Sequence, residues 1–123
     1  MIWKYTVFGI PRTKKNSSEL VKGPWGGLRP LPSRAWREWC RTARVVWDRR
    51  NPPAAIRVPV NCSAVFYRDR RVGDAIGYFQ GLADLLEKHG VVADDKFIVS
   101  WDGSRLDHDK ADPRVEVELE EVG

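Results

Sequence analysis

The stretch DAIGYFQGLADLLEKHG, from Asp74 to Gly90, decides the fold that we expect for this chain. Its apolar residues recur at helical spacing, as Phe79, Leu82 and Leu86 illustrate. Asp74 is a favoured N-cap residue, and Gly90 is a favoured residue just past a helix end. The stretch therefore predicts an amphipathic helix.

Two glycines interrupt this predicted helix, Gly77 and Gly81. Each costs about 1 kcal/mol of helix stability relative to alanine. We therefore expect them to permit the close approach of another backbone or of a ligand.

Outward from this helix, the sequence predicts strands and a second helix. That helix is expected over residues 34–49, with Ser33 as its N-cap and prolines after residue 51 as its stop. Segment 11–32 is rich in Pro, Gly, Lys and Arg, so we expect a long basic loop that can act as a substrate arm. Alternating or β-branched residues predict strands over residues 2–8, 57–67, 97–101 and 115–120.

These elements predict the fold class. The 123 residues are enough for one hydrophobic core and too few for two. The prediction is a single α+β domain over residues 1–123, in the order βαβαββ, with two helices packed on a mixed sheet of about four strands.

Composition argues against several classes of protein. No stretch approaches the roughly 18 apolar residues of a membrane span, and the first residues resemble a strand rather than a signal peptide. We therefore expect a cytoplasmic protein that is neither exported nor inserted in a membrane. Cys40 and Cys62 lack the spacing of a zinc site, and we expect two structural thiols.

The net charge of +4 is distributed unevenly along the chain. Residues 1–72 carry a net charge of +12, and residues 73–123 carry a net charge of −8. A basic half with Trp and Tyr suits a nucleic-acid backbone, and an acidic half can hold divalent cations. Charge alone leaves open the alternative that folding interleaves the two halves into a mixed surface.

Carboxylates around the central helix are candidate metal ligands. Hydrolysis of a phosphodiester needs charge neutralisation and an activated water, and Mg²⁺ held by carboxylates supplies both. Asp74 begins the helix, whereas Asp94 and Asp95 follow its end, about 20 Å away at 1.5 Å per residue. A reversal at Gly90 can bring them back toward Asp74. The alternative is that Asp74 is only an N-cap and the Asp94-Asp95 pair only a polar turn.

The sequences GD at 73–74 and ADLLEKHGVVADD at 83–95 together resemble the core signature of RusA-type Holliday-junction resolvases. In that family an Asp opens the helix, a D-x-L sequence follows, a glycine ends the helix, and an Asp-Asp pair precedes the next strand. The basic opening GIPRTKKNS, residues 9–17, is also similar to that family's N-terminal segment.

The resemblance implies a homodimeric endonuclease that nicks four-way junctions or other branched DNA in recombination and repair. It implies Mg²⁺ as the cofactor, with Mn²⁺ as a possible substitute and no small-molecule cofactor. Asp74 and Asp95 match catalytic metal ligands of that family.

The chain departs from that family at two positions. The usual D-x-D-N-L-x-K sequence is DAIGYFQ here, so Ile76 replaces a carboxylate and Gln80 replaces a lysine. Either the domain is inactive or another acid substitutes. Asp94, adjacent to Asp95, is a candidate catalytic carboxylate, and Asp102 is our preferred metal ligand. Because Asp102 precedes a glycine, a turn is the alternative. Asp84 lies on a different side of the helix from Asp74, and we expect it to have a structural hydrogen-bonding role.

Candidate DNA contacts are basic or polar side chains that can reach phosphates. They are Arg12, Lys14, Lys15, Asn16, Arg70, Arg71, Gln80 and Lys96. For the loop lysines the alternative is an ordinary solvated loop. A second basic stripe at Arg34, Arg37, Arg41 and Arg44 is either phosphate-facing or an exposed helix face.

Three functions remain open at this point. The first is a metal-dependent nuclease, and the second is a branched-DNA-binding protein that kept the fold and lost the chemistry. The third is a protein-interaction domain whose acidic half binds a basic partner. Cleavage of branched DNA, binding without cleavage, and the absence of DNA binding distinguish them.

Overall fold

The computed structural model describes residues 1–14, 16–22, 28–48 and 54–123, and only the backbone of residues 16–22 and 28–32. Its elements are β1 (Ile2–Phe8), β2 (Asn16–Lys22), β3 (Leu28–Pro32), α1 (Arg34–Thr42), β4 (Arg44–Trp47), β5 (Val60–Arg68), α2 (Ala75–Lys88), a 3₁₀ turn η1 (Asp95–Phe97), β6 (Ile98–Ser100), β7 (Arg105–His108) and β8 (Arg114–Glu121).

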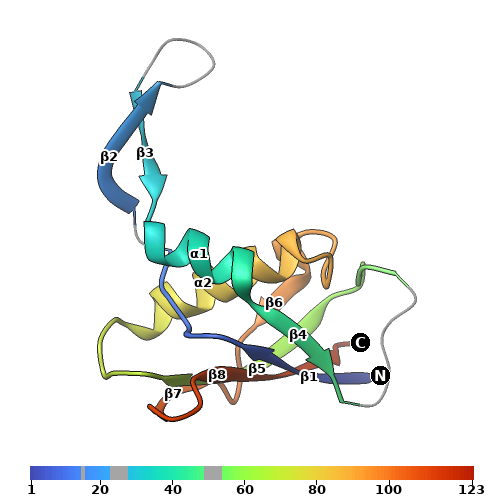
Figure 1. Cartoon of the computed structure of the whole chain (residues 1–123). Helices are drawn as coiled ribbons and strands as arrows, with labels where there is room; N and C mark the ends of the chain where they lie inside the picture. Colours follow the sequence, from blue (N-terminus) through green and yellow to red (C-terminus); the bar gives the residue numbers. More distant parts are fainter. Residues whose placement is uncertain (15, 23–27, 49–53) are drawn as a thin grey trace.

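Six strands form one mixed sheet, and both helices lie on the same side of it (Figure 1). The strand order is β4-β1-β8-β5-β6, and β7 also pairs with β5. Strand β8 is antiparallel to both β1 and β5, whereas β6 and β7 run parallel to β5. The predicted α+β class is therefore confirmed, with six strands in the sheet rather than about four.

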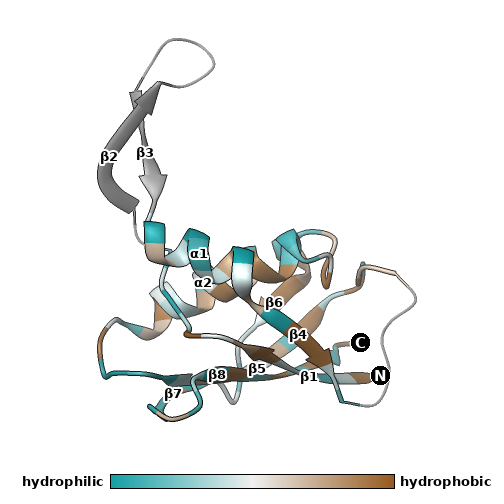
Figure 2. Ribbon diagram, viewed as in Figure 1, coloured by the Kyte–Doolittle hydropathy of each residue, from teal (hydrophilic) through white to brown (hydrophobic). Residues whose placement is uncertain are grey.

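Alternation along the strands explains why only one face carries the core. In β1, Trp3, Tyr5 and Val7 are buried, and the residues between them are more exposed. The long strands β5 and β8 alternate in the same way. Hydrophobic residues follow these strands and α2 in Figure 2, whereas α1 is largely hydrophilic. From α1, Trp36 and Trp39 reach the core.

The first helix is shorter than the sequence predicts. It ends at Thr42, because Ala43 adopts an extended conformation (φ −62°, ψ 140°). Residues 44–47 then form β4 at the sheet edge, where Val46 pairs with Thr6 of β1. β-branched residues suit a strand as well as a helix, so the helical spacing over residues 43–47 was misleading.

The predicted loop over residues 11–32 is also different in the structure, because it contains a hairpin. Strands β2 and β3 pair antiparallel in a separate two-stranded sheet, which we call the arm. The arm stands away from the helices and the main sheet (Figure 1). At its base, the Ser33 hydroxyl donates a hydrogen bond to the Thr13 carbonyl oxygen at 3.4 Å.

Two further expectations concern the thiols and the membrane. Both cysteines are free, as predicted. Burial raises the pKa of Cys40 to about 11 and also raises the pKa of the fully buried Cys62. Among the helices of the described residues, none has the length and apolar character needed to cross a membrane.

Candidate metal and nucleic-acid site

Helix α2 positions most of the candidate residues, and its first turn is fixed by Asp74. The Asp74 carboxylate accepts a hydrogen bond from the Gly77 amide at 2.7 Å, which confirms the predicted N-cap. At the other end, Gly90 adopts a left-handed conformation (φ +73°), and the Val91 amide bonds back to the Leu86 carbonyl. The predicted helix end at Gly90 is confirmed.

The basic segment 12–14 packs directly on the two helix glycines. A β-carbon at Gly81 would lie 2.7 Å from the Arg12 carbonyl oxygen, and one at Gly77 would lie 3.0 Å from the Thr13 methyl carbon. The predicted close approach of another backbone is therefore confirmed at Gly81. Because neither position has room for a methyl group, the glycines seat the segment that leads into the arm.

This packing creates an open hollow at the start of α2, with a volume of about 310 Å³. Its lining brings together several residues that the sequence singled out, from the helix and from the basic segment: Thr13, Lys14, Gly73, Asp74, Ile76, Gly77 and Gln80. We call this space the α2 hollow.

Basic side chains beside the α2 hollow are held in defined positions. Arg12 forms an ion pair with Asp69 at 3.1 Å. Lys14 forms one with Asp84 at 2.8 Å and lies over the Trp36 ring, 5.2 Å from its centroid. Asp84 therefore has a structural partner, in agreement with the role we expected for it.

Of the remaining candidate DNA contacts, three are exposed in the structure, and two have side chains that the structure does not describe. Arg70 and Arg71 are exposed in the connector between β5 and α2, and Lys96 is exposed in the turn η1. Lys15 lies outside the described residues, and the side chain of Asn16 is not described. The predicted arginine stripe is split between two elements, because Arg44 belongs to β4 rather than to α1.

Three carboxylates converge at the opposite end of α2. Ligand oxygens of Glu87, Asp94 and Asp95 lie within 4.8 Å of one another. The Asp95 amide donates a hydrogen bond to the Glu87 carboxylate at 3.0 Å, and the Asp94 carboxylate accepts one from the Lys96 amide at 2.9 Å. We call these three residues the carboxylate cluster.

Burial, hydrogen bonds and the charges of neighbouring acids shift the pKa values of Asp94 and Asp95 in opposite directions. Partial burial raises the pKa of Asp95, and so do a hydrogen bond with Asp94 and the charges of Asp84 and Glu87. The hydrogen bond from the Lys96 amide lowers the pKa of Asp94. Hard oxygen donors packed this closely fit Mg²⁺ or Mn²⁺, because a divalent cation would neutralise the repulsion.

The cluster does not include all the predicted metal ligands. Asp74 caps the first turn of α2, whereas Glu87 lies in its last turn, about 20 Å away at 1.5 Å per residue. The return of the Asp94-Asp95 pair toward Asp74, which the sequence allowed, is not seen in this chain. The chain instead reverses at Gly90 and meets the helix at Glu87.

Asp102, our preferred extra ligand, also lies apart from the cluster. Its backbone is fixed by Asn61, which accepts a hydrogen bond from the Asp102 amide at 2.9 Å. Asp102 lines a different open hollow, together with Glu118 and Glu120 of β8. The structure therefore favours the alternative that we gave for Asp102, a residue of a turn. The acid that sequence reasoning missed is Glu87.

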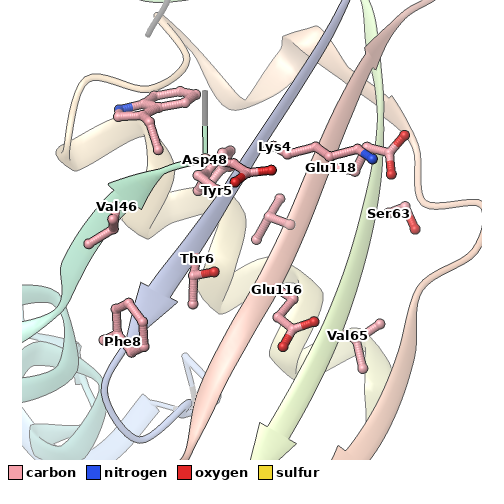
Figure 3. Close-up of a pocket in the computed structure, with 12 residues that line it drawn as sticks. Lys4, Tyr5, Thr6, Phe8, Val46, Asp48, Ser63, Val65, Glu116 and Glu118 are labelled. Atoms are coloured by element: carbon pink, nitrogen blue, oxygen red, sulfur yellow. The ribbon is translucent and has the colours of Figure 1, made fainter. Parts of the chain in front are cut away.

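A further hollow, of about 520 Å³, lies on the uncovered face of the sheet (Figure 3). Lys4, Thr6 and Phe8 of β1 line it together with Glu116 and Glu118 of β8. Glu116 is already bound to Arg114 at 2.8 Å. This hollow lacks the close convergence of acids that marks the carboxylate cluster, so we place the candidate site on α2.

No protein-family model matches this sequence, and no curated protein is significantly similar to it.

Proposed function

We propose that this protein is a Mg²⁺-dependent, structure-specific endonuclease that nicks four-way junctions or other branched DNA. The observation that carries the proposal is the carboxylate cluster at the last turn of α2, on the same helix whose Asp84 binds Lys14 of the basic segment. The sequence resemblance to RusA-type resolvases supports the same reaction and a cytoplasmic homodimer. A dimer also suits a four-way junction, whose resolution needs two paired nicks.

Glu87, Asp94 and Asp95 are the residues that would hold the cation, with Mn²⁺ as a possible substitute. When bound there, the cation supplies charge neutralisation at the phosphate and an activated water. The hydrogen bond from the Lys96 amide lowers the pKa of Asp94 and so favours the ionised carboxylate that a cation would bind. Burial and the nearby acids raise the pKa of Asp95, and a bound cation would act against this rise because it stabilises the ionised carboxylate.

The basic residues have a separate task, the binding of phosphates. Arg70 and Arg71 are exposed beside the start of α2, and Lys96 is exposed beside the carboxylate cluster. Lys14 lies between the two ends of the helix, with Asp84 as its partner. A DNA backbone along α2 would therefore meet cations at both ends, which orients it toward the acids.

The test is cleavage of a labelled four-way junction and a matched linear duplex in Mg²⁺, Mn²⁺ or EDTA. We expect metal-dependent nicks in the junction with the wild-type protein. Asp95→Asn and Glu87→Gln should abolish nicking while DNA binding remains. Asp102→Asn is the matched control, because it removes the same charge outside the cluster, and it should nick normally. Equal nicking by all four proteins would refute the assignment.

The second candidate is a branched-DNA-binding protein without catalytic activity. Ile76 and Gln80 of the α2 hollow favour it, because the RusA-type family that the sequence resembles has a carboxylate and a lysine at these two positions. The separation of Asp74 from the carboxylate cluster favours it too. The same experiment decides, since this candidate binds the junction and leaves it intact in every metal.

A further inference from the structure

Ile76 has the highest exposed fraction of any large hydrophobic side chain among the described residues, 77%. It lies in the first turn of α2, two residues after the N-cap. The core does not use it, because α2 packs on the sheet through other residues, including the fully buried Leu82, Leu85 and Leu86. Val72, just before the helix, is also 50% exposed.

A single exposed apolar residue is ordinary on a protein surface. The surroundings of Ile76 are what distinguish it. It lines the α2 hollow together with Lys14, Gln80 and the capping carboxylate of Asp74. The exposed Arg70 and Arg71 precede the helix, only a few residues upstream. An apolar projection among cations and hydrogen-bonding groups matches a polyanion that also carries apolar surfaces.

We propose that Ile76, with the exposed Val72 four residues before it, is an apolar wedge that contacts the exposed base faces at a DNA branch point. The neighbouring cations hold the flanking phosphates. This inference rests on the DNA-binding part of the proposed function and not on cleavage. It makes Ile76, which looks like a lost metal ligand, a determinant of substrate choice.

The physical basis is the unequal cost of separating stacked bases. Apolar side chains such as Ile insert at base steps in many proteins, and the cost of unstacking opposes the insertion. That cost is lowest where bases are already unpaired or unstacked. A wedge at Ile76 therefore favours branched DNA over an intact duplex, whereas the cations bind both forms alike.

The test compares binding of a fluorescent four-way junction and a linear duplex in EDTA, where no cleavage occurs. We expect Ile76→Ala to weaken junction binding about tenfold, because most of the apolar side chain that meets the bases is removed, and duplex binding less than about twofold. Ile76→Leu should retain the preference for the junction. Val99→Ala is the control, because Val99 is 56% exposed on β6 and does not line the α2 hollow.

A second readout detects the wedge itself. With 2-aminopurine at the branch point, wild-type protein should change the fluorescence of the base and Ile76→Ala should not. The inference is wrong if Ile76→Ala keeps the junction preference, or if its main effect is on self-association in sedimentation, which would assign Ile76 to a protein contact. If the protein prefers the junction to the duplex but does not nick it in Mg²⁺, the proposed nuclease activity is refuted and the proposed role of Ile76 is retained.

Discussion

At the scale of single residues, position 81 controls how the basic segment is seated. Ala normally stabilises a helix by about 1 kcal/mol over Gly. Here the added β-carbon would lie 2.7 Å from the Arg12 carbonyl oxygen. We therefore expect Gly81→Ala to lower the free energy of unfolding by about 1–3 kcal/mol, as overpacking does. Urea denaturation measures it, with Ile76→Ala as the exposed control on the same helix. A stabilised Gly81→Ala protein would contradict the close contact.

Among the side chains that the structure describes, Arg114 forms the most ion pairs, with Asp109, Asp112 and Glu116. It binds Asp109 at 2.9 Å and Glu116 at 2.8 Å and lies 4.1 Å from the Tyr67 ring centroid, with 18% of its side chain exposed. We expect Arg114→Ala to lower the free energy of unfolding by about 1–3 kcal/mol at pH 7. Arg105→Ala is the control, because its ion pair with Asp107 is long (3.9 Å) and exposed.

The Arg114 effect should depend on pH in a defined direction. The hydrogen bond from Arg114 lowers the pKa of Asp109 in the folded protein. Such a group stabilises the fold above its unfolded pKa, which is about 3.9 for Asp, and this stabilisation is lost as the pH falls through the lowered folded value. The difference between wild type and Arg114→Ala in urea should therefore narrow below about pH 4. A difference that is constant from pH 7 to pH 3 would exclude this linkage.

At the scale of elements, the arm forms a sheet separate from the main six-stranded sheet and its two helices, which we call the body. Both strands of the arm pair with each other in a sheet of their own. Its base is closed by the contact between Ser33 and Thr13. We expect replacement of residues 16–32 by a short Gly-Ser linker to change the free energy of unfolding by less than about 1 kcal/mol, because closing a shorter loop costs little. Thermal unfolding measures this, and a large loss of stability would mean that the arm supports the body.

The elements also show what could be predicted from sequence. Helix α2 was predictable because its cap, its apolar spacing and its terminal glycine are all local signals. Strand β4 was not, because its partner β1 lies far away in the sequence and its residues suit either structure. The hairpin in segment 11–32 was hidden by prolines and glycines, which usually indicate irregular structure.

The candidate site was predictable only in part, for the same reason. Asp94 and Asp95 were predicted as a pair, but the third acid of the cluster, Glu87, could not be identified because it depends on where the chain reverses. One local signal for Glu87 existed, since an acid in the last turn of a helix is disfavoured by the helix dipole. Asp102 could not be placed, because its position depends on how Asn61 of β5 fixes the turn after β6.

At the scale of the whole molecule, cation binding should raise the stability of the fold. A ligand that binds only the folded state at ten times its dissociation constant adds about 1.4 kcal/mol. We expect the melting temperature of the wild type and of Asp102→Asn to rise by a few degrees with Mg²⁺ or Mn²⁺, and that of Asp95→Asn to stay constant. Sodium chloride at equal ionic strength is the control for general screening. Equal shifts in all three proteins would mean that the cation acts elsewhere.

The half-buried thiol of Cys40 and the buried thiol of Cys62 have a practical consequence for chemical labelling. The thiolate is the reactive form of cysteine, and a raised pKa keeps Cys40 and Cys62 protonated at neutral pH. A cysteine introduced at the exposed Glu120, on the strand face opposite the helices, would therefore react with a maleimide dye well before either native thiol. One dye could then be attached on the side away from α2 without removing the two natural cysteines.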